Sequence, residues 1–190
     1  DYMSVIGEWD RSLQIIKEAH KKPTRKYTKR FLHLEARSQE NVLNFQKAAA
    51  LYYKYAKSYP KSSKAMSSLK KAHVYYKEEN LERQARETLL LICQQINYMP
   101  DKVSYCQEAV EEFTKLNNME KMTLALSALK TKKATSEDLL QYDLLKSQSF
   151  LKMGHISKGI AILKEALTKL RKYKLIEIKR SLRSNLHLAY

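Results

Sequence analysis

The sequence repeats a turn-and-helix layout every 36 or 37 residues, and this spacing restricts the fold more than any single motif does. The equivalent turn positions are Gly7, Leu43, Asn80, Asn117 and Gly154. Internal repetition at a period of about 20 to 50 residues is typical of solenoids, in which each short unit packs on its neighbours. The sequence therefore predicts about five repeats of 36 to 37 residues.

Side chains of the same size return at fixed offsets after each turn. Five residues after the turn the chain has Ser12, Ala48, Ala85, Met122 and Gly159, four of them small. Nine residues after the turn it always has a large side chain, at Ile16, Tyr52, Leu89, Leu126 and Leu163. Because these offsets share one face of a helix, we expect the second helix of each repeat to pack closely through that face.

The composition favours helices throughout. Three glycines and three prolines in 190 residues provide few turns, whereas leucine, lysine, alanine and glutamate are good helix formers. The sequence predicts an all-α fold, with helices at Glu8–Lys22, Arg25–Asn41, Val42–Ser58, Ser62–Glu79, Leu81–Asn97, Asp101–Leu116, Met119–Thr131, Ser136–Lys152, His155–Arg171 and Lys174–Tyr190. The prolines at positions 60 and 100 are expected to end the helices that precede them.

We expect one helical-repeat domain over residues 1–190, cut within a repeat at both ends. The last predicted helix carries Leu182, Leu186 and Tyr190 as an apolar stripe with no following helix to cover it, so oligomerisation through that face is one expectation. No run of about 18 apolar residues predicts a transmembrane helix. The sequence does not indicate a cellular compartment.

No pattern of chemically active residues predicts an enzyme. Cys93 and Cys106 lie at similar distances on either side of Pro100, so a disulfide is conceivable, but packed free thiols are the expectation. The five histidines are scattered and have no partners at catalytic or metal-binding spacing. The three glycines are isolated, which excludes a phosphate-binding loop of the glycine-rich type. We therefore expect no catalytic residues, metal or cofactor.

Three stretches resemble the tetratricopeptide repeat. GEWDRSL at Gly7–Leu13 and GHISKGI at Gly154–Ile160 follow the family's turn-to-helix layout, and Phe45–Ala65 has its helix-ending proline and capping serines. The resemblance covers the whole chain. It implies a solenoid of antiparallel helix pairs wound into a right-handed superhelix, and a partner bound on the concave side.

In that family the first helix of each pair lines the concave groove. The resemblance therefore implies a partner-binding set consisting of Arg30, His33, Arg37, Lys70, Lys71 and Lys77. This groove is basic in its first half. The Lys and Asn pattern with which some members hold a peptide carboxyl terminus is not reproduced, because no Asn lies among these positions.

The formal net charge of +16 favours an acidic partner. We expect a non-catalytic scaffold that binds an acidic or extended protein segment in the basic groove. The alternative is a helical-repeat protein that binds single-stranded RNA, in which tyrosines near lysines would stack on bases. Modular base readers use the same few polar residues in every unit, whereas the inner positions here vary, which favours a protein partner.

Overall fold

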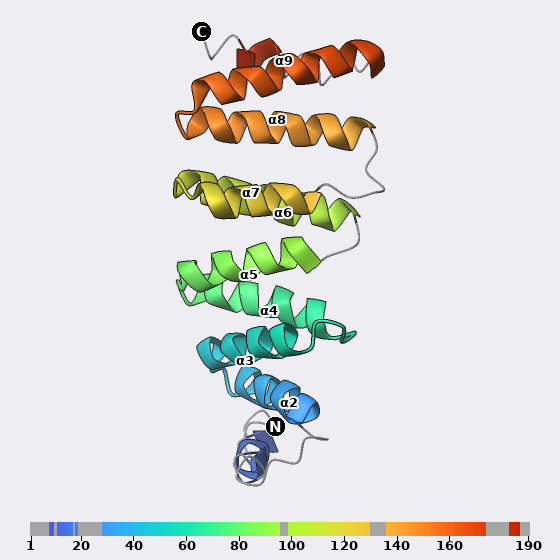
Figure 1. Cartoon of the computed structure of the whole chain (residues 1–190). Helices are drawn as coiled ribbons and strands as arrows, with labels where there is room; N and C mark the ends of the chain where they lie inside the picture. Colours follow the sequence, from blue (N-terminus) through green and yellow to red (C-terminus); the bar gives the residue numbers. More distant parts are fainter. Residues whose placement is uncertain are drawn as a thin grey trace. The chain divides into compact units, whose positions relative to one another are not determined.

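The computed structural model describes residues 8–9, 11–16, 18, 28–95, 99–129, 136–173 and 183–186, and these contain helices and no strand. The helices are α2 (Thr28–Asn41), α3 (Phe45–Ser58), α4 (Ala65–Glu78), α5 (Glu82–Gln95), α6 (Met99–Lys115), α7 (Met119–Leu129), α8 (Ser136–Lys152) and α9 (Ile156–Tyr173). The prediction of an all-α chain is confirmed for this part of the sequence (Figure 1).

The chain divides into two compact units, residues 1–95 and 96–190. In the first unit α2 packs against α3, α3 against α4, and α4 against α5, as the succession of ribbons in Figure 1 shows. In the second unit α6 pairs with α7 and α8 with α9, and α8 also contacts α6 and α7. Sequence neighbours therefore pair in both units. That the whole of 1–190 forms one domain stays a prediction.

The four predicted turns that lie in the described residues share one backbone geometry. Leu43, Asn80, Asn117 and Gly154 have φ values of 59°, 56°, 52° and 79°. Each donates its N–H to the carbonyl three residues earlier, at 3.0 to 3.1 Å, and the next residue donates to the carbonyl five residues before it, at 2.8 to 2.9 Å. This pair of bonds is the Schellman ending of a helix. The predicted turn positions are thus confirmed, and Gly7 lies outside the described residues.

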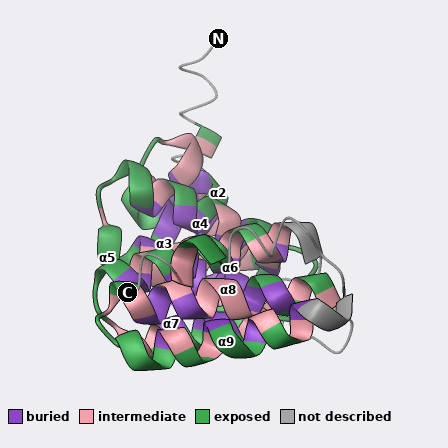
Figure 2. Cartoon of the chain, turned by 90° about the horizontal axis from the view of Figure 1, so that it is seen from above, coloured by how far each residue is buried: buried purple, intermediate pink, exposed green. Residues whose placement is uncertain are grey.

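The small and large positions after each turn are buried. Ala48, Ala85, Met122 and Gly159 are all buried, and a Cβ added at Gly159 would lie 2.6 Å from the Leu151 side chain. The large side chains nine residues after each turn are buried as well, at Tyr52, Leu89, Leu126 and Leu163. Buried and exposed residues alternate along α8 and α9 in Figure 2, as expected for helices with one buried face.

The first unit has a core made largely of alanine and tyrosine, whereas the second has one rich in leucine. In the first, the cluster consists of Ala36, Ala48, Ala49, Tyr52, Ala72, Tyr76 and Ala85. In the second, the cluster consists of Leu140, Leu163, Ala166 and Leu170, and Leu186 packs against it. Leu186, which the sequence analysis placed on an uncovered stripe, thus has a partner surface within its own unit. The other two residues of that stripe lie outside the described residues.

Two expectations from the sequence are wrong. Helix α6 begins at Met99, so Pro100 lies in its first turn rather than before it; a proline is tolerated there because first-turn N–H groups have no partner within the helix. The expectation of free thiols also fails, since Cys93 on α5 and Cys106 on α6 are both buried and disulfide-bonded. The sequence indicates that the cysteines are buried, but a free thiol and a disulfide are both compatible with burial.

Candidate anion-binding site

One face of α2 carries a line of basic side chains. Lys29, Arg30, His33, Leu34 and Arg37 all line a pocket of about 440 Å³ in the first unit. Positions 30, 33, 34 and 37 are three or four residues apart, so consecutive helical turns bring them to the same side. Lys29, Arg30 and Arg37 are exposed. Helix α2 therefore forms a basic wall of the pocket.

The other wall comes from α3 and the loop that leads into α4. It consists of Tyr55, Ser62, Ser63 and Lys64. The hydroxyls of Tyr55 and Ser62 are hydrogen-bonded at 2.7 Å, which fixes the loop against α3. The loop thus places one further cationic side chain, that of Lys64, and two serine side chains in the same pocket lining as the α2 cations.

None of the residues that line this pocket is acidic. In the described part of the chain, the structure gives no ion pair to Lys29, Arg30, Arg37 or Lys64. Two of the four contact aromatic rings instead: the Lys29 ammonium lies 5.9 Å from the centre of the Tyr59 ring, and the Arg37 guanidinium 5.9 Å from that of Trp9. Positive charge that is gathered in a lining without a carboxylate attracts an anion.

His33 lies at the centre of this positive charge. Its ring meets those of Tyr55 and Tyr52 edge-on, with centroids 5.0 and 5.8 Å apart. Burial lowers the pKa of His33, and so do the nearby charges of Lys64, Arg37 and Lys71, whereas Glu40 acts in the opposite direction with a smaller effect. The neutral imidazole is therefore favoured while the pocket holds no anion.

A carboxylate one turn beyond the pocket joins three helices. Glu40 of α2 accepts hydrogen bonds from Lys71 Nζ at 2.6 and 2.8 Å, from Tyr75 Oη at 2.6 Å, and from Tyr52 Oη. Burial alone would raise the pKa of Glu40, but the bonds from Lys71, Tyr52 and Tyr75 together hold it below its ordinary value. Burial and the bond to Glu40 raise the pKa values of both tyrosines.

The structure thus divides the six predicted partner-binding residues into two groups. Arg30, His33 and Arg37 lie together in the pocket. Lys71 is instead paired with Glu40, and neither Lys70 nor Lys77 lines the pocket. Partner binding by any of the six stays a prediction. The Lys71 ammonium is thus engaged within the fold, where it links α4 to α2 through Glu40.

Sequence reasoning missed most of the second wall and the role of Glu40. The serines at positions 62 and 63 were interpreted only as helix caps. On the α2 wall, Lys29 was not among the predicted binding residues, although it belongs to the densest basic cluster of the sequence, at positions 25–30. The sequence did contain an indication of the role of Glu40, because Tyr52 lies at a repeated position that is predicted to be buried. A phenol that is buried in a core needs a hydrogen-bond partner, and an acid near the end of the preceding helix could supply it.

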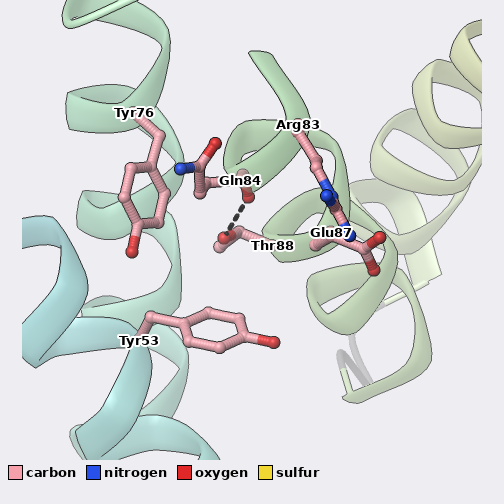
Figure 3. A pocket seen from close by; sticks show the side chains of 6 residues that line it. All are labelled: Tyr53, Tyr76, Arg83, Gln84, Glu87 and Thr88. Atoms are coloured by element: carbon pink, nitrogen blue, oxygen red, sulfur yellow. Dashed lines mark hydrogen bonds between the residues drawn. The ribbon is translucent and has the colours of Figure 1, made fainter. Parts of the chain in front are cut away.

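A second cavity of about 270 Å³ lies in the same unit, between α3, α4 and α5. Figure 3 shows the rings of Tyr53 and Tyr76 on one side and the side chains of Arg83 and Glu87 on the other, with Thr88 Oγ1 donating to the carbonyl of Gln84 at 2.7 Å. This lining combines both signs of charge. It therefore indicates no single class of ligand, unlike the pocket at α2.

Comparison with family models, with curated proteins and with solved structures finds no match. Among the residues described, no cluster of His, Cys, Asp and Glu could hold a metal ion. Over the same residues, no helix is both long and apolar enough to cross a membrane. The pocket at α2 is therefore interpreted from its own geometry and charge.

Proposed function

We propose that the chain is a non-catalytic interaction module that binds an acidic, extended segment of a partner protein at the α2 pocket. One observation carries this proposal: the cations of α2 and Lys64 converge on one pocket with no carboxylate in its lining. Like charges gathered in this way repel one another unless an anion neutralises them, so a bound acidic segment would be stabilised by all of them together.

We also propose that the pocket belongs to a solenoid of tetratricopeptide-like helical hairpins. The support is the recurrence of one turn geometry at Leu43, Asn80, Asn117 and Gly154, each 37 residues after the last. In such an array the first helix of each pair faces the partner. Helix α2 is the first helix of its hairpin, which agrees with the position of the pocket.

The test is a charge reversal with a matched control. The pocket variant replaces Arg30, Arg37 and Lys64 by glutamate, and the control replaces Lys47, Lys54 and Lys164, which are equally exposed and lie outside the pocket. Binding of a fluorescein-labelled oligoglutamate peptide is followed by fluorescence anisotropy. Circular dichroism confirms that both variants are folded.

We expect the pocket variant to lose about 2 kcal/mol or more of binding free energy, roughly thirtyfold in Kd, since three favourable pairs become repulsive. The control should change Kd by less than about threefold, because its charges act only from a distance. Equal losses in the two variants would mean that the peptide senses only net charge. Unchanged binding in both would place the partner site elsewhere.

A further inference from the structure

The α2 pocket combines guanidinium groups with hydroxyl donors. Arg30 and Arg37 lie two helical turns apart on one wall, about 10 Å along the helix axis at 1.5 Å per residue. Ser62 and Ser63 offer hydroxyls from the opposite wall, and Lys64 adds a further cation beside them. A guanidinium presents a planar fork of N–H donors that fits two oxygens of one oxyanion, whereas an ammonium acts as a point charge.

These donors outnumber the acceptors of a single carboxylate. A phosphorylated side chain carries about −1.5 to −2 charges at neutral pH and three strong acceptor oxygens, compared with one charge and two oxygens for glutamate. We propose that the α2 pocket recognises phosphoryl groups on an extended segment of a partner protein, with Arg30 and Arg37 as the binding forks and Ser62, Ser63 and Lys64 closing the site. This inference rests on the proposed function and makes its ligand more specific.

The distance between the two arginines suggests how the phosphoryl groups are spaced. A chain in the extended polyproline II conformation advances about 3.1 Å per residue and completes a turn every three residues. Residues i and i+3 therefore point to the same side, about 9 Å apart, which is close to the roughly 10 Å between Arg30 and Arg37. A segment with phosphorylated residues at positions i and i+3 would therefore present one group to each arginine. The pocket volume of about 440 Å³ leaves room for such side chains between the two walls.

The aromatic rings in the pocket lining and behind it favour a phosphorylated protein over single-stranded nucleic acid. Binding of single strands depends on bases that stack on exposed aromatic faces. Tyr52 and Tyr55 are only 1% and 2% exposed, and the His33 ring packs edge-on against both. These rings are therefore not available as stacking platforms, and the pocket offers mainly charge and hydrogen bonds.

His33 provides an internal probe of a phosphoryl group in the pocket. The groups that face it are Arg37 and Glu40 of its own helix, the rings of Tyr52 and Tyr55 from α3, Lys71 of α4 and Lys64 of the loop. A doubly charged phosphoryl group bound among these charges would favour the protonated form of the His33 ring. Nuclear magnetic resonance of the histidine rings at several pH values should show that the pKa of His33 rises when a phosphopeptide is bound. An unchanged pKa of His33 in the presence of saturating phosphopeptide would overturn the placement of the phosphoryl group in this pocket.

The binding experiment uses the full chain and three fluorescein-labelled Gly–Ser peptides. One carries phosphoserine at two positions three residues apart, the second has glutamate at those positions, and the third is unmodified. We expect the phosphopeptide to bind at least about tenfold more tightly than the glutamate peptide, because charge-assisted bonds to arginine are stronger and more numerous. Equal affinities for the two acidic peptides, both lost in the pocket charge-reversal variant, would overturn the phosphoryl proposal and leave the proposed function standing.

A conservative variant separates recognition from simple charge attraction. Replacing Arg30 and Arg37 by lysine (R30K/R37K) keeps the net charge but removes both guanidinium forks. We expect this variant to lose about tenfold in affinity for the phosphopeptide and distinctly less for the glutamate peptide, because a carboxylate offers fewer oxygens to the lost forks. Unchanged phosphopeptide binding would overturn the assignment of the two arginines.

A nucleic-acid probe decides between the two classes of partner. Oligouridylate and the phosphopeptide are compared at the same salt concentration, because the affinity of nucleic acid depends steeply on salt. Tighter binding of oligouridylate that is lost in the pocket charge-reversal variant would overturn a phosphoprotein partner in favour of RNA. Failure of all the acidic probes to bind would reject the proposed function itself.

Discussion

Glu40 is an acid enclosed within a strongly basic chain, and its position explains how the first unit is held together. Its two oxygens together accept from one lysine and two tyrosines on the neighbouring helices. Each donor would otherwise need another partner, since Tyr52 is buried and Tyr75 is half-buried. A single carboxylate thus fixes α2 relative to α3 and α4, and with it the wall that carries Arg30, His33 and Arg37.

Replacing Glu40 by glutamine should destabilise the protein by about 1 to 3 kcal/mol, because bonds to a charged acceptor are lost while the partly exposed ion pair adds little. The loss should depend on pH. The pKa of Glu40 is below its ordinary value, so its contribution is present above about pH 4.5 and disappears as the pH falls through the lower native value.

Urea unfolding followed by circular dichroism at several pH values measures this difference. Glu79→Gln serves as the control, since Glu79 is exposed in the turn after α4 and should change stability by less than about 0.5 kcal/mol. A Glu40→Gln protein as stable as the wild type at neutral pH would show that the carboxylate does not hold the three helices together.

At the scale of single elements, the turns adopt a left-handed backbone conformation that glycine prefers, at positions where the sequence mostly has other residues. Three of the four described turn positions are not glycine, although all have positive φ. Leu43 is the most unfavourable of them, because a branched side chain crowds the backbone in the left-handed region, whereas asparagine tolerates it. Its side chain is 56% exposed, so it contributes little packing in return.

Leu43→Gly should therefore stabilise the first unit by up to about 1 kcal/mol. Glycine removes the strain of the left-handed conformation, and the greater entropy of the unfolded chain offsets part of this gain. Gly154→Ala should have the opposite effect and cost about 1 kcal/mol. A Cβ at position 154 would meet nothing within 4 Å, so this cost is conformational rather than steric. Denaturant unfolding measures both changes, and shifts of the same sign would contradict the shared turn geometry.

At the scale of the whole molecule, periodicity was sufficient to predict the helical class and the positions of the turns, but not the α2 pocket. The turn positions, the buried columns and the helical class follow from spacing, because backbone hydrogen bonding and burial of one helical face repeat with the sequence. The pocket depends on where the loop before α4 folds back on α2. That arrangement brings Lys64 into the same pocket lining as Arg30 and Arg37, and spacing alone does not predict it.

The same reason explains why Lys71 was grouped with the pocket arginines. It shares a predicted groove face with them, and only the side-chain geometry shows that Glu40 binds it. The state of the two cysteines was also beyond a single sequence. A buried thiol and a buried disulfide satisfy the same apolar pattern, so the spacing of apolar residues does not separate them.

The chain's formal net charge of +16 attracts any anion, so the decisive question is how much of the attraction is local. The affinity of the intact protein for oligoglutamate should fall as salt rises from about 0.05 to 0.5 M, because screening shortens the reach of every exposed charge. The charge-reversal variants at Arg30, Arg37 and Lys64, and at the three control lysines, lower the net charge by the same six units. They differ only in where the charge is changed.

We expect the pocket variant to show a shallower salt dependence than the wild type, because fewer charges contact the peptide and fewer counterions are exchanged on binding. The control variant should keep the wild-type slope with a small uniform loss of affinity. Anisotropy titrations over the salt series give both slopes. Identical slopes in the two variants would show that the charge of the whole surface, rather than the pocket on α2, attracts the acidic segment.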